Sequence, residues 1–219
     1  MNFLNKVRDL EEIVEKFHDN QVMMIGGFMS AGTPEVFIDA LIAKGCKNLT
    51  VIANDTGFVD TGIGRLIANK QIGKIIATHV GTNKETGRQM NAGEIEYELI
   101  PQGTLAERIR AAGAGLGGFL TPTGVGTIVE EGKQKLTIEG KEYLLELPIR
   151  AEIALLHAWK ADTYGNLIYR VATRNFNPLM AMAADIVVVS AEEIVEVGEL
   201  DPDTVHTPGK LVDMLIRGL

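Results

Sequence analysis

Seven consecutive residues near the amino terminus have the composition of a loop that can bind an anion. They are Gly26, Gly27, Phe28, Met29, Ser30, Ala31 and Gly32. Glycines allow a ligand to approach the main chain closely, and backbone N–H groups beside the start of a helix can face a negative charge. The pattern therefore predicts a site that binds an anion, or that stabilises an oxyanion as it forms during a reaction.

A buried strand and a helix should hold this loop between them. Residues 22–25, Val-Met-Met-Ile, have the length and composition of a buried strand. In the following helix, Thr33 is expected to act as the N-cap, Pro34 to lie in the first turn and Glu35 to complement the positive end. Gly45 is a natural stop for this helix. The stretch thus predicts a strand, a glycine turn and a helix in direct succession.

Other reactive side chains lack the neighbours that their chemistry requires. Ser30 and Ser190 are the only serines, and Ser30 is offset from the serine position of a nucleophile elbow, with no matching histidine and acid evident. Cys46 is the only cysteine and has no obvious activator, so we expect an inert thiol. None of the four histidines has metal-ligand spacing, and His79, at the end of an expected strand, is the best outside candidate.

Two further segments invite a functional interpretation. Residues 113–118 match Gly-x-Gly-x-x-Gly, but a dinucleotide-binding turn follows a strand and opens a helix, whereas a helix is expected before this one. A backbone lining or a subunit contact is therefore the better interpretation of that segment. Glu130 and Glu131 can supply a carboxylate, although a solvated turn before a hairpin is the better explanation.

Composition limits the class of protein. The chain has 219 residues, enough for one α/β domain over 1–219 with a sizeable core. A net charge of −8 argues against general nucleic-acid binding. One cysteine permits no internal disulfide, and the first residues lack the apolar core of a signal peptide, so a cytoplasmic location is expected.

Strands alternate with helices along the chain, which predicts an α/β fold with a mainly parallel sheet and helices on both faces. Residues 135–147 contain a hairpin signal and should form a small antiparallel excursion. Amphipathic or apolar patterns predict helices over residues 3–18, 175–184 and 211–216. The loops after the strands are polar and glycine-rich, where open α/β sheets bind ligands.

The glycine loop lies within a longer pattern that resembles the first signature of coenzyme A transferases, the class that passes CoA between carboxylates. Asp19, Asn20, residues 23–25, residues 26–28, Gly32 and Pro34 fill every fixed place of that signature. Stretches over roughly residues 5–216 are similar to the α subunits of two-subunit transferases of the acetate and acetoacetate type. These stretches read ANDTGFVDTGIG, HVGTN, PQGTL, GAGLGGFLTPTGVGT, EEGK, RNFNPLMAMAAD and VHTPG.

The resemblance implies a three-layer fold that is shared with some sugar-phosphate isomerases. It also implies transfer of CoA from a short-chain acyl-CoA to a carboxylate such as acetate or acetoacetate, with no cofactor and CoA as a substrate. In the family, a glutamate in a Ser-Glu-Asn-Gly motif of the β subunit is the nucleophile, and this chain contains no such motif. The implied roles are therefore CoA and substrate binding by residues 26–32, no catalytic residue here, and a β partner in a heterotetramer or larger assembly.

Two alternatives remain open from the residues alone. A sugar-phosphate isomerase of related fold would bind phosphate at the same loop, and it would need its own acid and base. A non-catalytic subunit would keep the loop only for structure. Ring-opening activity of the chain alone would indicate the first alternative. CoA-dependent changes in thermal stability would distinguish the second, although ligand binding alone does not prove catalysis.

Overall fold

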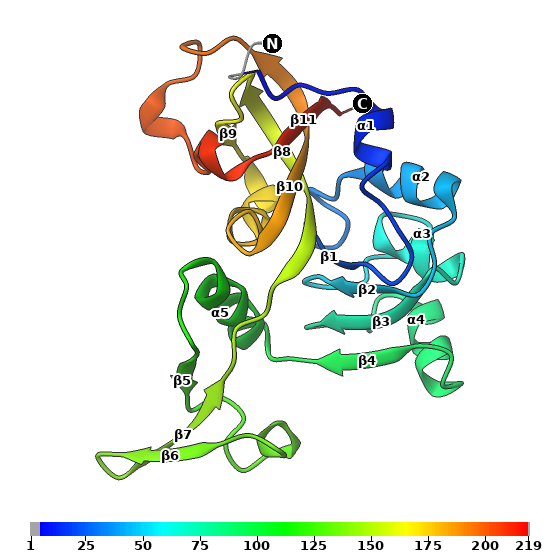
Figure 1. Ribbon diagram of the computed structural model, residues 1–219. Coiled ribbons are helices and arrows are strands. Elements are labelled where there is room, and N and C mark those ends of the chain that lie inside the picture. The colour runs from blue at the N-terminus through cyan, green and yellow to red at the C-terminus, as the bar shows by residue number, and fades with distance from the viewer. Residues whose placement is uncertain (1–4, 219) are drawn as a thin grey trace.

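The computed structural model describes residues 5–218, and within them a central sheet of eight strands runs through the molecule (Figure 1). Seven strands lie in the order β11-β10-β8-β1-β2-β3-β4 with parallel pairing throughout, and β9 pairs antiparallel with β8. The strands are β1 (Val22–Ile25), β2 (Leu49–Ile52), β3 (Ile72–Ala77), β4 (Glu96–Leu99), β8 (Ala151–Asp162), β9 (Leu167–Ile168), β10 (Ala184–Val195) and β11 (Met214–Arg217).

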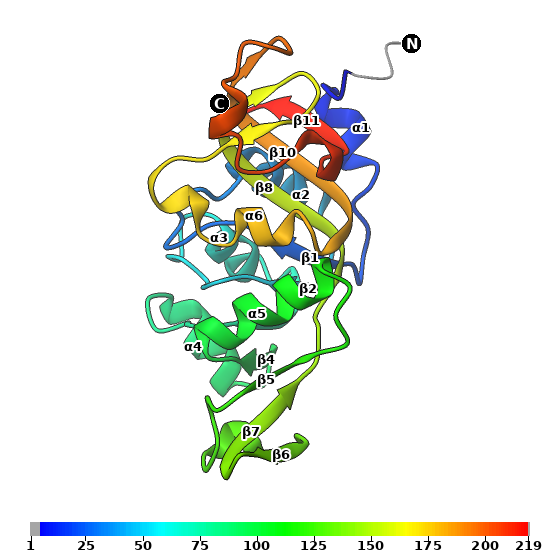
Figure 2. The ribbon, with the colours of Figure 1, turned by 90° about the vertical axis from the view of Figure 1, so that its left-hand side faces the viewer.

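Helices cover both faces of this sheet, as the alternation of elements predicts (Figures 1 and 2). Met23 and Ile25 of β1 enter the core beneath one helical layer, while Met24 enters the core on the opposite face. The first layer contains α1 (Leu10–Val14), α2 (Glu35–Lys44), α3 (Ile63–Ala68) and α4 (Lys84–Asn91), and the second contains α5 (Gln102–Gly113) and α6 (Asn177–Met180). Both faces of β1 are therefore buried, which explains its uninterrupted apolar sequence.

A second sheet projects beyond β4 at one end of the molecule (Figure 2). It has the order β5-β7-β6, with β5 (Phe119–Thr121), β6 (Lys135–Ile138) and β7 (Lys141–Glu146) all antiparallel. Glu139 and Gly140 form the hairpin turn at φ 50° and 79°, the backbone that a two-residue hairpin favours. The expected antiparallel excursion is thus confirmed.

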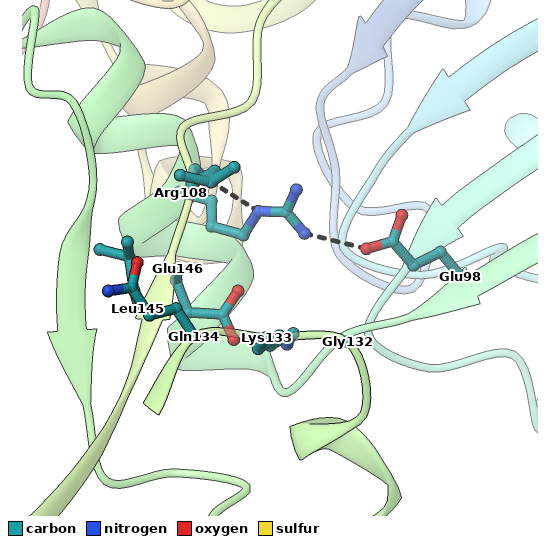
Figure 3. Close-up of a pocket in the computed structure, with 8 residues that line it drawn as sticks. Glu98, Arg108, Gly132, Lys133, Gln134, Leu145 and Glu146 are labelled. Atoms are coloured by element: carbon teal, nitrogen blue, oxygen red, sulfur yellow. Dashed lines mark hydrogen bonds and ion pairs between the residues drawn. The ribbon is translucent and has the colours of Figure 1, made fainter. Parts of the chain in front are cut away.

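Charged side chains join this small sheet to the main body around a cavity of about 380 Å³ (Figure 3). Arg108 of α5 pairs with Glu98 of β4 at 2.9 Å and donates to the carbonyl of Leu147 at 2.8 Å. Lys133 pairs with the buried carboxylate of Glu146. Each cation that lines the cavity already has a carboxylate partner, so we assign these residues a structural role.

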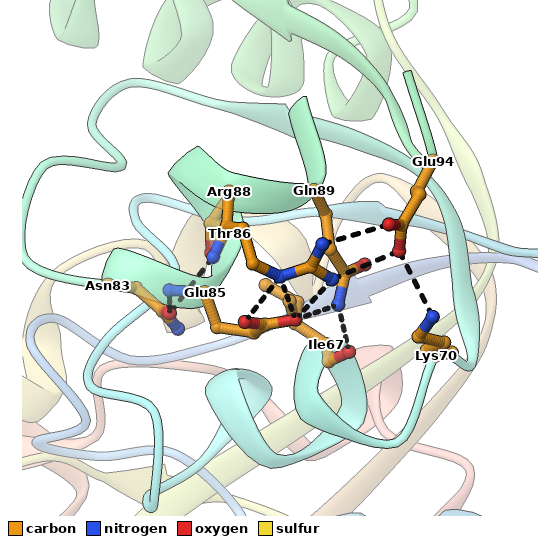
Figure 4. A network of polar contacts seen from close by, with 8 residues as sticks. All are labelled: Ile67, Lys70, Asn83, Glu85, Thr86, Arg88, Gln89 and Glu94. Atoms are coloured by element: carbon orange, nitrogen blue, oxygen red, sulfur yellow. Dashed lines mark hydrogen bonds and ion pairs between the residues drawn. The ribbon is translucent and has the colours of Figure 1, made fainter. Parts of the chain in front are cut away.

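The start of α4 is fixed by a cap and by a surface ion network (Figure 4). Asn83 Oδ1 accepts hydrogen bonds from the N–H groups of Glu85 and Thr86, both at 3.1 Å. Arg88 pairs with Glu85 and with Glu94, each at 2.8 Å. Hydrogen bonds from Arg88 lower the pKa of both carboxyl groups to about 2. This network ties α4 to the turn that precedes β4.

The helix expected at the start of the chain is shorter than predicted, and the one expected at its end is wrong. Residues 3 and 4 of the expected helix 3–18 lie outside the described residues, and within residues 5–18 only Leu10–Val14 is α-helical. Residues 6–8 are extended because Arg8 N–H donates to the Leu215 carbonyl and Leu215 N–H donates to that of Lys6. The expected helix 211–216 is instead an edge strand, with Val188 of β10 paired to Met214.

The prediction of a helix over residues 175–184 also fails in its extent. The α-helix covers only Asn177–Met180, and Ala184 already begins β10, which runs parallel to β8 over its whole length. Short apolar runs such as these fit a buried helix or a buried strand equally well, so pairing partners elsewhere in the chain decide between the two.

Candidate functional site

The glycine loop leaves the carboxyl end of β1 and forms a tight left-handed turn. Gly26 N–H donates to the Leu155 carbonyl of β8 at 3.0 Å, which extends the parallel ladder by one residue. Phe28 and Ala31 then exchange two backbone hydrogen bonds of 2.9 and 2.8 Å. The two residues between them, Met29 and Ser30, have φ values of 50° and 68°, in a left-handed region that residues other than glycine seldom adopt.

This turn leaves backbone donors unpaired. Among residues 5–218, no acceptor forms a hydrogen bond with the N–H groups of Gly27, Ser30 and Gly32. Most backbone N–H groups in folded proteins are paired with protein or with water, so these three donors are free to bond to water or to a ligand. Donors of this kind are the ones that binding of a negative oxygen requires, and the assignment of residues 26–32 as the binding site stays a prediction.

Asp55, which follows β2, holds the turn in place through a hydrogen bond to its backbone. Its Oδ2 accepts from the Met29 N–H at 2.9 Å and from Asn54 Nδ2 at 2.8 Å, and its Oδ1 accepts from the Gly57 N–H at 2.8 Å. The residue is buried. Because three donors converge on this carboxylate, they offset the cost of burying it and fix the strained turn in place. The sequence identifies Asp55 only as a polar residue at the end of an element.

Steric clearance explains the three glycines of the loop. A methyl group on Gly26 would overlap Asn177 Oδ1, and one on Gly27 would overlap Thr33 Oγ1. On Gly32, which has φ 76°, a Cβ would lie 2.8 Å from the Cα of Thr173. Each glycine therefore allows a close approach by another segment of the chain, in addition to any ligand.

The helix after the loop starts differently from the prediction. Thr33 makes no capping hydrogen bond, and Pro34 occupies the N-cap position of α2 rather than its first turn. The buried Thr33 side chain instead packs against Gly27 and Gly62. Glu35 accepts from the Gly62 N–H at 2.8 Å and pairs with Arg65 at 3.2 Å, which connects α2 to α3. Gly45 ends α2 at φ 73°, as predicted.

A polar chain extends from the loop to α5. Gln102 Nε2, near the start of α5, donates to Asn54 Oδ1 at 2.6 Å, and Asn54 in turn donates to Asp55. Asn54 is buried, whereas Gln102 is exposed. The amide of Gln102 thus lies at the surface while it is connected to the base of the turn, a placement that only the folded chain reveals.

The serine and histidine side chains form no reactive pair at this loop. Ser30, within the loop, is hydrogen-bonded to Thr61 at 2.7 Å, and no histidine of residues 5–218 forms a hydrogen bond with it. His157 lies 3.0 Å from Ser190 and 3.5 Å from Glu192. No sequence pattern indicates that this serine, histidine and glutamate lie next to one another. However, Ser190 is 1% exposed, and burial lowers the pKa of His157, so this arrangement is an internal contact between β8 and β10.

The remaining candidate residues lie in surroundings that suit a structural role rather than a catalytic one. His79 is exposed at the end of β3, and burial raises the pKa of the Cys46 thiol, which agrees with an inert cysteine. Glu130 accepts from the Gly126 N–H and pairs with Lys135, and these contacts lower its pKa. The segment 113–118 follows α5 and leads into β5, the reverse of a dinucleotide-binding turn. No cluster of three potential metal-ligating residues occurs within 5–218.

Comparisons with known proteins agree with this architecture. The family model described as coenzyme A transferase matches residues 7–218. The alpha subunit of the acetate CoA-transferase of Escherichia coli K12 is 57% identical over 211 residues, which cover 96% of each chain. The alpha subunit of the acetoacetyl-CoA:acetate/butyrate CoA transferase of Clostridium acetobutylicum is 48% identical over 213 residues, or 97% of this chain and 98% of the relative.

A solved structure shares the fold at lower identity. The apoenzyme of the acyl-CoA transferase YdiF from Escherichia coli O157:H7 superimposes with a TM-score of 0.85 and 23% identity, over 99% of this chain and 47% of that chain. Across residues 5–218, no helix has the length and apolar character needed to cross a membrane. The full-length family match and the close relatives establish that this chain belongs to the coenzyme A transferase family.

Proposed function

We propose that this chain is the α subunit of an enzyme that transfers CoA from a short-chain acyl-CoA to a carboxylate such as acetate or acetoacetate. The observation that carries the proposal is the set of unpaired N–H groups on Gly27, Ser30 and Gly32, within the loop that matches the family signature. The relatives named for acetate and for acetoacetyl-CoA with acetate or butyrate support the choice of short acids.

The reaction proceeds through two covalent intermediates on a glutamate of the partner subunit. The glutamate carboxylate attacks the thioester carbonyl, CoA leaves as a thiolate, and an acyl-glutamyl anhydride forms. The thiolate then attacks the glutamyl carbonyl and releases the donor acid, which leaves a glutamyl-CoA thioester. The acceptor carboxylate runs the same steps in reverse, so the free energy of the thioester is kept rather than lost to water.

The glycine loop acts on the oxyanions that form in these steps. Each attack on a carbonyl places a negative charge on oxygen, and donors that are already oriented stabilise it without reorganisation. Loss of one such donor typically lowers kcat by about 10²- to 10³-fold. Asp55 and the reciprocal bonds between Phe28 and Ala31 hold the loop rigid before the substrate arrives.

A partner subunit completes the site. Asp55, the carboxylate that contacts the loop, is buried and accepts three hydrogen bonds, so it is unavailable for attack on a thioester. Phe28 of the loop and Phe58, which follows Gly57, are 40% and 43% exposed, and they offer an apolar surface that a β subunit can cover. Both of the relatives described above are named as alpha chains, which supports a heterotetramer or a larger assembly here.

The test is co-expression with the candidate β subunit, followed by an exchange assay. Acetoacetyl-CoA and acetate, or acetyl-CoA and acetoacetate, should react with the assembled pair and not with this chain alone. Absence of exchange by an assembled pair, over a series of short acids, would refute the proposal. Ring opening of a sugar phosphate by the chain alone would instead favour the isomerase alternative.

A further inference from the structure

We propose that Asn177 is a positioning residue that holds both ends of the glycine loop and so sets the direction of its unpaired donors. The inference rests on the proposed function, because it gives Asn177 a role in presenting those donors. Asn177 is the first residue of α6, and its side chain is fully buried between the loop and β8.

The side-chain amide of Asn177 connects its own segment to β8 and to the glycine loop. Its Oδ1 accepts from the His157 N–H of β8 at 3.2 Å. Its Nδ2 donates to the Thr173 carbonyl at 2.8 Å and to the Gly32 carbonyl at 3.3 Å. Because an N–H lies on one side and two carbonyls on the other, only one orientation of the amide satisfies all three partners.

The same amide also contacts the first residue of the loop. A methyl group on Gly26 would overlap Asn177 Oδ1, so the absence of a side chain at Gly26 makes room for this amide. Asn177 therefore packs against Gly26, where the loop begins, and bonds to Gly32, where it ends. One buried side chain thus fixes the span across which the turn at Met29 and Ser30 must close.

The segment that precedes Asn177 adopts an unfavourable conformation to reach the loop. Val171 has φ 44°, a genuine outlier for a β-branched residue, and its side chain is 88% exposed. Two residues later, Thr173 packs directly beneath Gly32. An ion pair between Arg170 and Glu192 at 2.7 Å anchors this segment to β10. Strained backbone of this kind persists where the surrounding structure imposes it, and often lies at functional sites.

Asn177 affects turnover through the orientation of Gly32. Because Nδ2 holds the Gly32 carbonyl, it limits rotation of the peptide that joins Gly32 to Thr33, and it so fixes the position of Gly32, whose own N–H is unpaired. An error of about 1 Å in a catalytic arrangement can lower the rate by about 10²-fold. An interaction that serves the transition state alone lowers kcat with little change in KM when it is lost.

Gln71 offers a matched control at the opposite edge of the sheet. It is also a buried amide, and its Nε2 donates to the carbonyls of Leu41 and Cys46 at 2.8 and 2.9 Å. It precedes β3, at the amino-terminal edge of the parallel strands, whereas the loop follows the carboxyl end of β1. Loss of this amide should destabilise the fold without touching the loop.

The experiment compares Asn177→Ala, Asn177→Asp and Gln71→Ala in the assembled two-subunit protein. Both variants of Asn177 should lower kcat by about 10²-fold with KM for acyl-CoA within about threefold, whereas Gln71→Ala should keep kcat at a comparable loss of Tm. Asn177→Asp keeps the size of the side chain but turns an oxygen toward the two carbonyls, so it tests the contact even if the alanine variant fails to fold.

Hydrogen–deuterium exchange supplies a second readout that does not depend on activity. Peptides that cover residues 26–33 should exchange faster in the Asn177 variants, while peptides from β3 and β10 keep their protection. Equal kcat for the Asn177 variants and Gln71→Ala, in an active wild type, would overturn the inference and leave the proposed function intact. An inactive wild-type pair would contradict the proposed function, and unchanged loop exchange would then still refute the role of Asn177.

Discussion

Replacement of Gly32 by alanine should separate a purely conformational effect from a steric one, because the chain contains a matched glycine. Gly32 and Gly45 have nearly the same backbone φ angle, 76° and 73°. A Cβ on Gly45 would meet nothing within 4 Å, whereas one on Gly32 would lie 2.8 to 2.9 Å from Thr173. The two variants therefore share the cost of a left-handed alanine, about 1–2 kcal/mol, and differ in the clash.

The clash adds a second penalty at Gly32 alone. Overpacking of a tight contact typically costs about 1–3 kcal/mol, so Gly32→Ala should lose about 2–5 kcal/mol of unfolding free energy and Gly45→Ala about 1–2. The reduced entropy of the unfolded chain offsets both variants equally. Displacement of Gly32 also moves its free N–H, so the exchange rate should fall by about 10²-fold.

The assay is urea denaturation of each variant together with CoA exchange by the assembled pair. Gly45→Ala should retain wild-type turnover despite its lower stability. If Gly32→Ala and Gly45→Ala show equal turnover in assembled protein, the steric reasoning and the role of the loop would both be refuted.

Two further changes test the parts that support the site and the fold. Asp55→Asn replaces one of the carboxylate oxygens that accept from Met29, Asn54 and Gly57 with a donor, so stability should fall by about 1–3 kcal/mol and kcat by at least tenfold, as measured by denaturation and exchange. Arg88 lowers the pKa of Glu85 and Glu94 from 4.5 to about 2. Their stabilising contribution is therefore present above pH 4.5 and lost as the pH falls toward 2. Arg88→Ala should weaken the dependence of Tm on pH in that window, and an unchanged dependence would contradict the role of the network.

Local sequence patterns predict well the elements that hold the glycine loop. The strand at residues 22–25, the glycine loop and the stop at Gly45 are properties of contiguous residues, and each is confirmed. The α/β class and the antiparallel excursion also follow from local alternation and a hairpin signal. Contiguous residues therefore suffice to predict the strand, the loop and the end of the helix at the candidate site.

Contacts between distant segments escape that reasoning. Met29 and Ser30 are not residue types that indicate a left-handed turn. The partners that impose it are distant in sequence, because Asp55 lies 26 residues from Met29 and Asn177 lies 145 residues from Gly32. The strand at residues 214–217 is predicted by its sequence to be part of a helix, because an apolar run shows no hydrophobic periodicity when both faces of the element are buried. In each case, the deciding contact forms only after the sheet has assembled.

The division of labour between the two chains is tested most directly by the position of the covalent intermediate. The assembled pair is mixed with acyl-CoA, the glutamyl adduct is trapped, and peptides of both chains are mapped by mass spectrometry. The adduct should lie on a glutamate of the β subunit, and this chain should carry none. An adduct on any residue of this chain, Glu130 and Glu131 included, would contradict the proposal that the α subunit contributes donors rather than the nucleophile.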